Sequence, residues 1–320
     1  MIENLIDFKK FNLMAFEASS GTDRAILAAE LDTILQESGF LFLTGHGVPK
    51  DIIESQWQVV LNFFSQPEEM KRKISVPHPG YPYGWIGQNQ ESLAASKGVI
   101  TLPDLKESFN GGPPTIPLGL LDKQAYEFCY QPTIFPDLEG FKEAWTLYYV
   151  EMEKLAKRIM RAFAEALGLE KMYFDKFILN PISALRALYY PATHKIESVG
   201  QQRAGAHTDY GSLTILLPEK GSNGLQVFLN NQWIDVPTEE DCFIINIGDL
   251  MEHWTSGKWI STSHRVFSQP EQPSRYSLAF FHQPDWDAEI VPICGTIPEK
   301  TVQSGPYLMS KFLSTTKPAS

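Results

Sequence analysis

The hydrophobic pattern divides the chain into a helical first half and a strand-rich second half. Between Phe141 and Gly168, apolar residues recur at spacings of three and four, which predicts a long amphipathic helix. Shorter helices are expected at residues 22–38 and 51–66, and the apolar segment FLFLTGHGVP between them predicts a buried strand that ends in a turn. These elements indicate an α/β layer followed by a long supporting helix.

The hydrophobic period changes after Gly168. Short segments rich in branched and aromatic residues are separated there by Gly, Pro, Asn or Asp, a pattern typical of strands and turns. Seven strands are predicted, in the segments ALRALYYP, SLTILLP, LQVFLN, QWIDVP, CFIINIGD, ISTSHRVF and YSLAFFHQP. No helical pattern alternates with them, so an antiparallel sandwich or jelly roll is favoured over a parallel sheet with crossover helices.

The chain is expected to fold around one principal core of the α+β class, mainly β with flanking helices. Its 320 residues, 43% of them hydrophobic, suffice to bury one large core. We expect four regions in chain order: an amino-terminal region at 1–120, a helical support at 121–179, the jelly-roll core at 180–286 and a carboxy-terminal extension at 287–320.

Composition excludes several classes of partner. The formal net charge of −11 disfavours nucleic acid and anionic membrane surfaces. Cys129, Cys242 and Cys294 form no Cys-x-x-Cys pair, which argues against a disulfide framework or a thiolate zinc site. The start MIENLIDFKK lacks the pattern of a signal peptide, and no apolar run reaches the roughly 18 residues of a membrane span. We expect a soluble, cytoplasmic protein that is a monomer or a weak homo-oligomer.

Candidate metal ligands lie in the segment AGAHTDYGSL. On an extended backbone His207 and Asp209 point to the same side, and an imidazole with a carboxylate makes two thirds of a facial ligand set for ferrous iron. The third ligand of such a set is a histidine, for which His264 is best placed, with His253 and His282 as alternatives. A lone His-x-Asp pair is also typical of ordinary hydrogen-bonded residues, so the spacing by itself leaves both interpretations open.

Two further strand segments carry candidate binding residues. Arg275 and Ser277 share one face of a predicted strand, where a guanidinium fork and a hydroxyl suit the distal carboxylate of a cosubstrate. A structural ion pair and an ordinary strand serine are the alternatives. Arg186, Leu188 and Tyr190 share a face of another strand, and Arg186 is expected either to bind an anionic substrate or to belong to a structural ion pair.

The segment GYPYGWIG is the expected aromatic contribution to a substrate pocket. Its candidates are Tyr81, Tyr83 and Trp85, for which ordinary packing is the alternative. Asn246, in INIGD, is expected to form a turn at the end of a strand rather than to take part in the chemistry.

Many segments together resemble the non-haem iron(II) and 2-oxoglutarate-dependent dioxygenases of the isopenicillin N synthase type. The resemblance covers most of the chain, and its motifs follow one another in order. They are FLFLTGHGVP, FFSQPEEMKRKI, GYPYGWIG, DLKESFNGG, LRALYYP, GAHTDYGSLTIL, GLQVF, INIGDLMEHWTSGKWISTSHRV and RYSLAFFHQPDWDAEI.

The resemblance implies a double-stranded β-helix, which is a distorted jelly roll, braced by the long helix and the amino-terminal layer. It implies an iron(II) ligand set of His207, Asp209 and His264. It also implies a 2-oxoglutarate site made by Arg275, Ser277 and Tyr190. Leu188 departs from several plant members, which carry asparagine at this position, and its apolar side chain offers no polar contact to the cosubstrate.

The implied activity is oxidation of a small organic substrate by O2, with 2-oxoglutarate converted to succinate and CO2. Hydroxylation is expected ahead of desaturation or ring closure. If Arg186 has no internal partner, its guanidinium favours a substrate that carries a carboxylate. If it pairs with an internal Asp or Glu, the pocket is left apolar and suits an uncharged aromatic or terpenoid substrate. The rivals are an oxidase of the same fold that does not consume 2-oxoglutarate, a silent small-molecule-binding barrel, and a zinc hydrolase, which the lack of a His-Glu-x-x-His helix disfavours.

Overall fold

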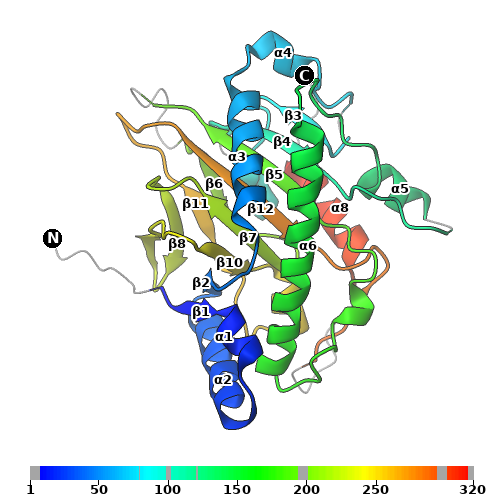
Figure 1. Cartoon of the computed structure of the whole chain (residues 1–320). Helices are drawn as coiled ribbons and strands as arrows, with labels where there is room; N and C mark the ends of the chain where they lie inside the picture. The colour runs from blue at the N-terminus through cyan, green and yellow to red at the C-terminus, as the bar shows by residue number, and fades with distance from the viewer. Residues whose placement is uncertain are drawn as a thin grey trace.

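Two β-sheets form the centre of the protein (Figure 1). The structure is a computed structural model that describes residues 8–78, 80–98, 102–119, 122–193, 201–293 and 301–315; Cys294 lies outside them. The larger sheet contains, in spatial order, β1 (Lys10–Asn12), β2 (Phe40–Thr44), β10 (Phe243–Ile247), β7 (Leu213–Pro218), β12 (Arg275–His282), β5 (Ala184–Tyr190), β4 (Glu107–Gly111) and β3 (Gly84–Ile86). The smaller sheet contains β6 (Ala204–His207), β11 (His264–Val266), β8 (Leu225–Leu229) and β9 (Gln232–Asp235).

The strands pair as an antiparallel jelly roll, which confirms the predicted fold class. All seven predicted strands are present, and among the described strands of the two sheets β1 and β2 are the only two that pair in parallel. The amino-terminal strands extend the larger sheet at both edges, since β2 pairs with β10 and β4 pairs with β5. The first part of the chain and the jelly roll therefore share one sheet.

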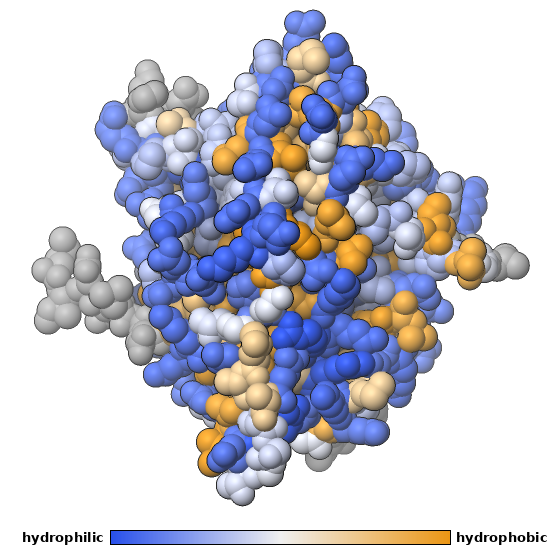
Figure 2. All heavy atoms as spheres, viewed as in Figure 1, coloured by the Kyte–Doolittle hydropathy of each residue, from blue (hydrophilic) through white to orange (hydrophobic). Residues whose placement is uncertain are grey.

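Helices cover the outer face of the larger sheet. The longest, α6 (Phe141–Ala166), confirms the predicted amphipathic helix and packs beside α3 (Lys50–Ser65) in front of the sheet (Figure 1). Its buried side carries the predicted apolar residues, among them Trp145, Tyr148, Met152, Leu155, Ile159 and Phe163. Figure 2 shows the outward surface over these helices as mostly hydrophilic, with apolar residues in small separate groups. Burial of one apolar stripe therefore fixes the helix to the sheet.

Shorter elements complete the described chain. They are α1 (Leu13–Ala18), α2 (Gly21–Glu37), α4 (Glu68–Arg72), η1 (Leu93–Lys97), α5 (Lys123–Cys129), η2 (Asp175–Phe177), α7 (Asp249–Trp254), the pair β13 (Glu289–Ile290) and β14 (Val302–Gln303), and α8 (Ser304–Thr315). In the described part of the chain, no helix combines the length and the apolar character needed to cross a membrane.

The alternation of side chains along β5 and β12 separates the core from an internal cavity. Leu185 and Ala187 belong to the hydrophobic cluster that includes α6. Arg186, Leu188 and Tyr190 point the other way, into a cavity lined by both sheets. The face shared by these three residues was predicted from the sequence, and the antiparallel register places Tyr190 opposite Arg275 and Leu188 opposite Ser277.

Candidate metal centre

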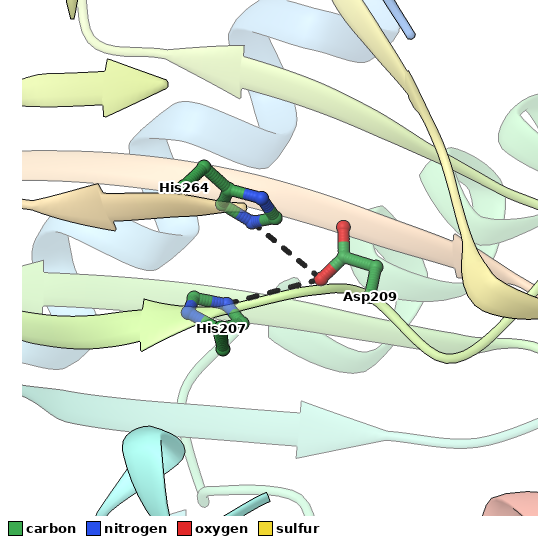
Figure 3. Close-up of side chains that lie close together, drawn as sticks. All are labelled: His207, Asp209 and His264. Atoms are coloured by element: carbon green, nitrogen blue, oxygen red, sulfur yellow. Dashed lines mark ion pairs between the residues drawn. The ribbon is translucent and has the colours of Figure 1, made fainter. Parts of the chain in front are cut away.

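Three side chains converge in the cavity from the smaller sheet and the loop that follows β6. His207 ends β6, His264 begins β11, and the two residues are register partners. Asp209 lies two residues beyond β6, and its Oδ1 is 3.9 Å from Nε2 of His207 and 3.7 Å from Nε2 of His264 (Figure 3). One ligand atom from each residue lies within 4.8 Å of the others. The structure thus brings together the three residues proposed from the sequence as a ligand set.

Hydrogen bonds aim both imidazoles at the centre of this cluster. Nδ1 of His207 lies 2.7 Å from the carbonyl oxygen of Gly205, and Nδ1 of His264 lies 3.1 Å from that of Thr262. A Nδ1–H that donates to a carbonyl leaves the Nε2 lone pair free to bind a metal. Burial, followed by the proximity of His264, lowers the pKa of His207 to about 3. His207 is therefore neutral at pH 7, which is the form that binds metals.

The carboxylate of Asp209 is held through its second oxygen. Oδ2 accepts hydrogen bonds from Thr214 Oγ1 at 2.5 Å and from Asn246 Nδ2 at 2.7 Å, so Oδ1 is left facing the histidines. Burial opposes ionisation of Asp209, but the two histidines and these hydrogen bonds outweigh it and lower the pKa of the carboxyl. The prediction that Asn246 forms a turn was wrong, because this residue lies within β10 with its side chain buried.

Removing the support of Asp209 is expected to weaken metal binding without removing a ligand. Asn246→Leu and Thr214→Val each delete one donor to Oδ2, and loss of such an outer partner typically lowers metal affinity by roughly 10–100-fold. Titration of the metal-free variants with Mn²⁺ measures this effect. Wild-type affinity in both variants would show that the two hydrogen bonds do not orient the carboxylate.

Arg275, Ser277 and Tyr190 meet at one end of the cavity. Arg275 is 3% exposed, and its guanidinium carbon lies 5.1 Å from the centre of the Tyr190 ring. Nε and Nη1 of Arg275 are buried without a hydrogen-bond partner among the described residues. Burial lowers the pKa of this guanidinium. An unpaired buried cation is costly, so this end of the cavity suits an anionic group that accepts from both nitrogens.

Arg186 lies farther along the same sheet and has an internal partner. Its Nη1 and Nη2 each lie 3.4 Å from an oxygen of Glu91, and both residues line the cavity. Of the two alternatives derived from the sequence, the structure therefore shows the internal ion pair.

The aromatic segment contributes one of its three predicted residues to the cavity. Tyr83 lines it and donates to the carbonyl of Cys129 at 2.7 Å. The prediction was wrong for Trp85, which is buried in the core with its indole donating to Glu107. It was also wrong for Tyr81, which does not line the cavity and whose hydroxyl donates to the carbonyl of Pro132. Gly84, at φ +132°, interrupts the extended backbone between Tyr83 and Trp85, so the side chain of Tyr83 faces the cavity and that of Trp85 faces the core.

The outer wall of the cavity includes residues that the sequence did not suggest. These are Phe128 of α5 and Leu308 and Phe312 of α8. Their helices are far from the ligand motifs in the chain, and single apolar residues there carry no signal of a shared wall.

Comparisons with known proteins agree with this arrangement. Residues 181–284 match the family model of the 2OG-Fe(II) oxygenase superfamily. Residues 4–138 match a second family model, described as "non-haem dioxygenase in morphine synthesis N-terminal". Validamycin A dioxygenase of Streptomyces hygroscopicus subsp. limoneus is 32% identical over 89% of this chain and 79% of its own. The 2-oxoglutarate-dependent dioxygenase tropC of Talaromyces stipitatus is 33% identical over 89% of this chain and 88% of its own.

Solved structures show the same fold. A full-length protein of Neurospora crassa, solved in complex with alpha-KG, superimposes with a TM-score of 0.82 at 30% identity, covering 95% of each chain. A 2OG-Fe(II) oxygenase family protein of Caulobacter crescentus gives a TM-score of 0.80 at 26% identity, over 95% of this chain and 98% of that one.

The chain belongs to the 2OG-Fe(II) oxygenase superfamily. It is an iron(II)- and 2-oxoglutarate-dependent dioxygenase that oxidises a small substrate with O2 as co-substrate.

Proposed function

We propose that His207, Asp209 and His264 bind one iron(II) ion and that Arg275, with Ser277, binds the distal carboxylate of 2-oxoglutarate. The observation that carries this proposal is that Nε and Nη1 of Arg275 have no hydrogen-bond partner among the described residues, while Arg275 lines the same cavity as the three ligands. Two imidazole nitrogens and one carboxylate oxygen form the donor set that suits ferrous iron.

The bound iron supplies oxidation by O2, coupled to conversion of 2-oxoglutarate to succinate and CO2. The residues of the chain position the cosubstrate and the substrate. Arg275 and Tyr190 face each other at the proposed cosubstrate end, and the next pair of residues along the sheet is Ser277 and Leu188. Apolar residues of β12, Ala279 among them, line the cavity toward Arg186 and keep water from the reacting atoms.

For the substrate we propose a small organic molecule that is hydroxylated. Two similar structures support a small substrate, since the Neurospora crassa protein was also solved with alpha-KG and thymine, and JOX2 was solved with 2OG, Fe and JA. We also propose that the protein acts in the cytoplasm as a monomer or weak homo-oligomer. The free thiols of Cys129 and Cys242 support a reducing compartment.

Succinate formation tests the proposed function. The purified protein is loaded with Fe(II) and supplied with 2-oxoglutarate, O2 and a panel of small molecules, and succinate is measured beside substrate loss. One succinate is expected for each substrate oxidised. Substrate oxidation without succinate would indicate an oxidase that does not consume 2-oxoglutarate, and lack of O2 uptake with every compound would indicate a silent binding barrel.

A further inference from the structure

Four buried charges form a chain beside the cavity. Nη2 of Arg186 lies 3.4 Å from Glu91, and Nζ of Lys106 lies 3.1 Å from Glu91 and 2.8 Å from Asp104. The four side chains are between 1% and 14% exposed. Burial opposes ionisation of Glu91, but Arg186 and Lys106 outweigh it and lower its pKa to about 2, and the two carboxylates raise the pKa of Lys106. Two carboxylates and two cationic side chains make up the cluster, so its formal charges balance.

Backbone hydrogen bonds fix this cluster relative to the metal centre. Oδ1 of Asp104 accepts from the N–H of Gly205 at 2.9 Å, and the carbonyl of Gly205 is the partner of His207 Nδ1. Oδ2 of Asp104 accepts from the N–H of Leu93 at 3.2 Å. The position of the charged groups is therefore tied to the position of a proposed iron ligand.

Two members of the cluster reach the cavity, where Asn110 joins them. Glu91, Arg186 and Asn110 line it, and Asn110 is the register partner of Arg186 on β4. Oδ1 of Asn110 is buried and has no donor among the described residues. The 3.4 Å contacts between Arg186 and Glu91 are long for charged hydrogen bonds, so both groups retain capacity for a further partner.

This polar patch is separate from the end assigned to 2-oxoglutarate. Arg186 lies opposite Ala279, whereas Tyr190, four residues along β5, lies opposite Arg275. At about 3.3 Å per residue these two positions are roughly 13 Å apart along the strand. A carboxylate at the patch would meet Glu91, and an ammonium would meet Arg186. An uncharged group with a donor beside an acceptor satisfies both residues and Asn110 without leaving a buried charge unpaired.

We propose that Glu91, Asn110 and Arg186 select an uncharged substrate that presents an N–H donor beside a carbonyl acceptor, as an amide, lactam or ureide does. The guanidinium donates to the carbonyl, and the carboxylate and the Asn110 oxygen accept from N–H groups. This inference rests on the proposed function, because the patch is a substrate site only if the opposite end holds 2-oxoglutarate.

Matched probes test this selection by binding. Protein loaded with Mn²⁺ and 2-oxoglutarate is titrated by calorimetry with uracil, 1,3-dimethyluracil and orotate, and with benzamide, N,N-dimethylbenzamide and benzoate. In at least one set, the uncharged compound with N–H donors is expected to bind at least tenfold more tightly than its N-methylated and carboxylate relatives. If neither uracil nor benzamide binds more tightly than both of its relatives, the proposal is wrong.

Variants assign the selection to the patch. Glu91→Gln and Asn110→Leu are each expected to weaken binding of the preferred probe at least tenfold and to leave 2-oxoglutarate affinity unchanged. Glu107→Gln is the matched control, because Glu107 is also buried and pairs with Lys71 at 2.7 Å, but lies outside the cavity lining. Asn110→Leu keeps the test decisive if Glu91→Gln does not fold.

The outcomes also separate the two proposals. Wild-type probe binding in folded Asn110→Leu, or an equal loss in Glu107→Gln, would overturn the assignment to the patch. Failure of the metal-loaded wild type to bind 2-oxoglutarate would instead overturn the proposed function.

Discussion

Replacing His207, Asp209 or His264 by alanine is expected to remove iron binding and turnover together. Each residue supplies one of three inward-facing ligand atoms, and the 4.8 Å cluster contains no fourth His, Cys, Asp or Glu among the described residues. Loss of an outer partner typically costs roughly 10–100-fold in metal affinity, so loss of a direct ligand is expected to exceed that range. Metal content after dialysis and titration with Mn²⁺ measure binding independently of substrate.

Two other histidines provide the controls. His282 is buried, but its Nδ1 lies 2.6 Å from Ser212 Oγ and it is not part of the cluster. His253 lies on α7, also outside the cluster. Folded His282→Ala and His253→Ala are expected to bind metal as the wild type does. If His264→Ala keeps full iron-dependent activity while either control loses it, the assignment of the third ligand is wrong.

The sequence predicted the elements whose signal is local. Branched and aromatic residues between turn residues marked seven of the ten strands described after Gly168, and the spacing of three and four marked α6. The shared face of Arg275 and Ser277 followed from the period of a strand, and both residues are buried in the cavity. Such predictions succeed because the regular period of a helix or strand determines which way each of its side chains points.

The features that sequence reasoning missed depend on contacts between distant segments or on a local irregularity. Asn246 supports Asp209 from β10, and nothing in INIGD indicates that contact. Glu91 and Arg186 lie 95 residues apart, so the pairing could be stated only as an alternative. Trp85 was misplaced because one glycine at positive φ changes the direction of the side chains that follow it.

Arg275→Ala is expected to weaken 2-oxoglutarate binding strongly while the metal still binds. Truncating one partner of a buried hydrogen-bonded charge pair costs about 2–5 kcal/mol, which corresponds to roughly 30-fold or more in affinity. Arg275→Lys keeps the charge but loses the two-pronged geometry, so its affinity is expected to lie between those of the wild type and Arg275→Ala. Calorimetric titration of the Mn²⁺-loaded proteins with 2-oxoglutarate measures the three values.

Arg186→Lys is the control that shows whether 2-oxoglutarate binding requires the guanidinium of Arg275 in particular or any arginine of the cavity. Both arginines line the cavity, but Arg186 is paired with Glu91, whereas Nε and Nη1 of Arg275 have no partner among the described residues. If an unpaired guanidinium is what binds the distal carboxylate, Arg186→Lys keeps wild-type affinity for 2-oxoglutarate and Arg275→Lys loses it. Unchanged 2-oxoglutarate affinity in both Arg275→Lys and Arg275→Ala would show that another residue binds the distal carboxylate. Arg186 would then be the next candidate, and its ion pair with Glu91 would have to open to admit that carboxylate.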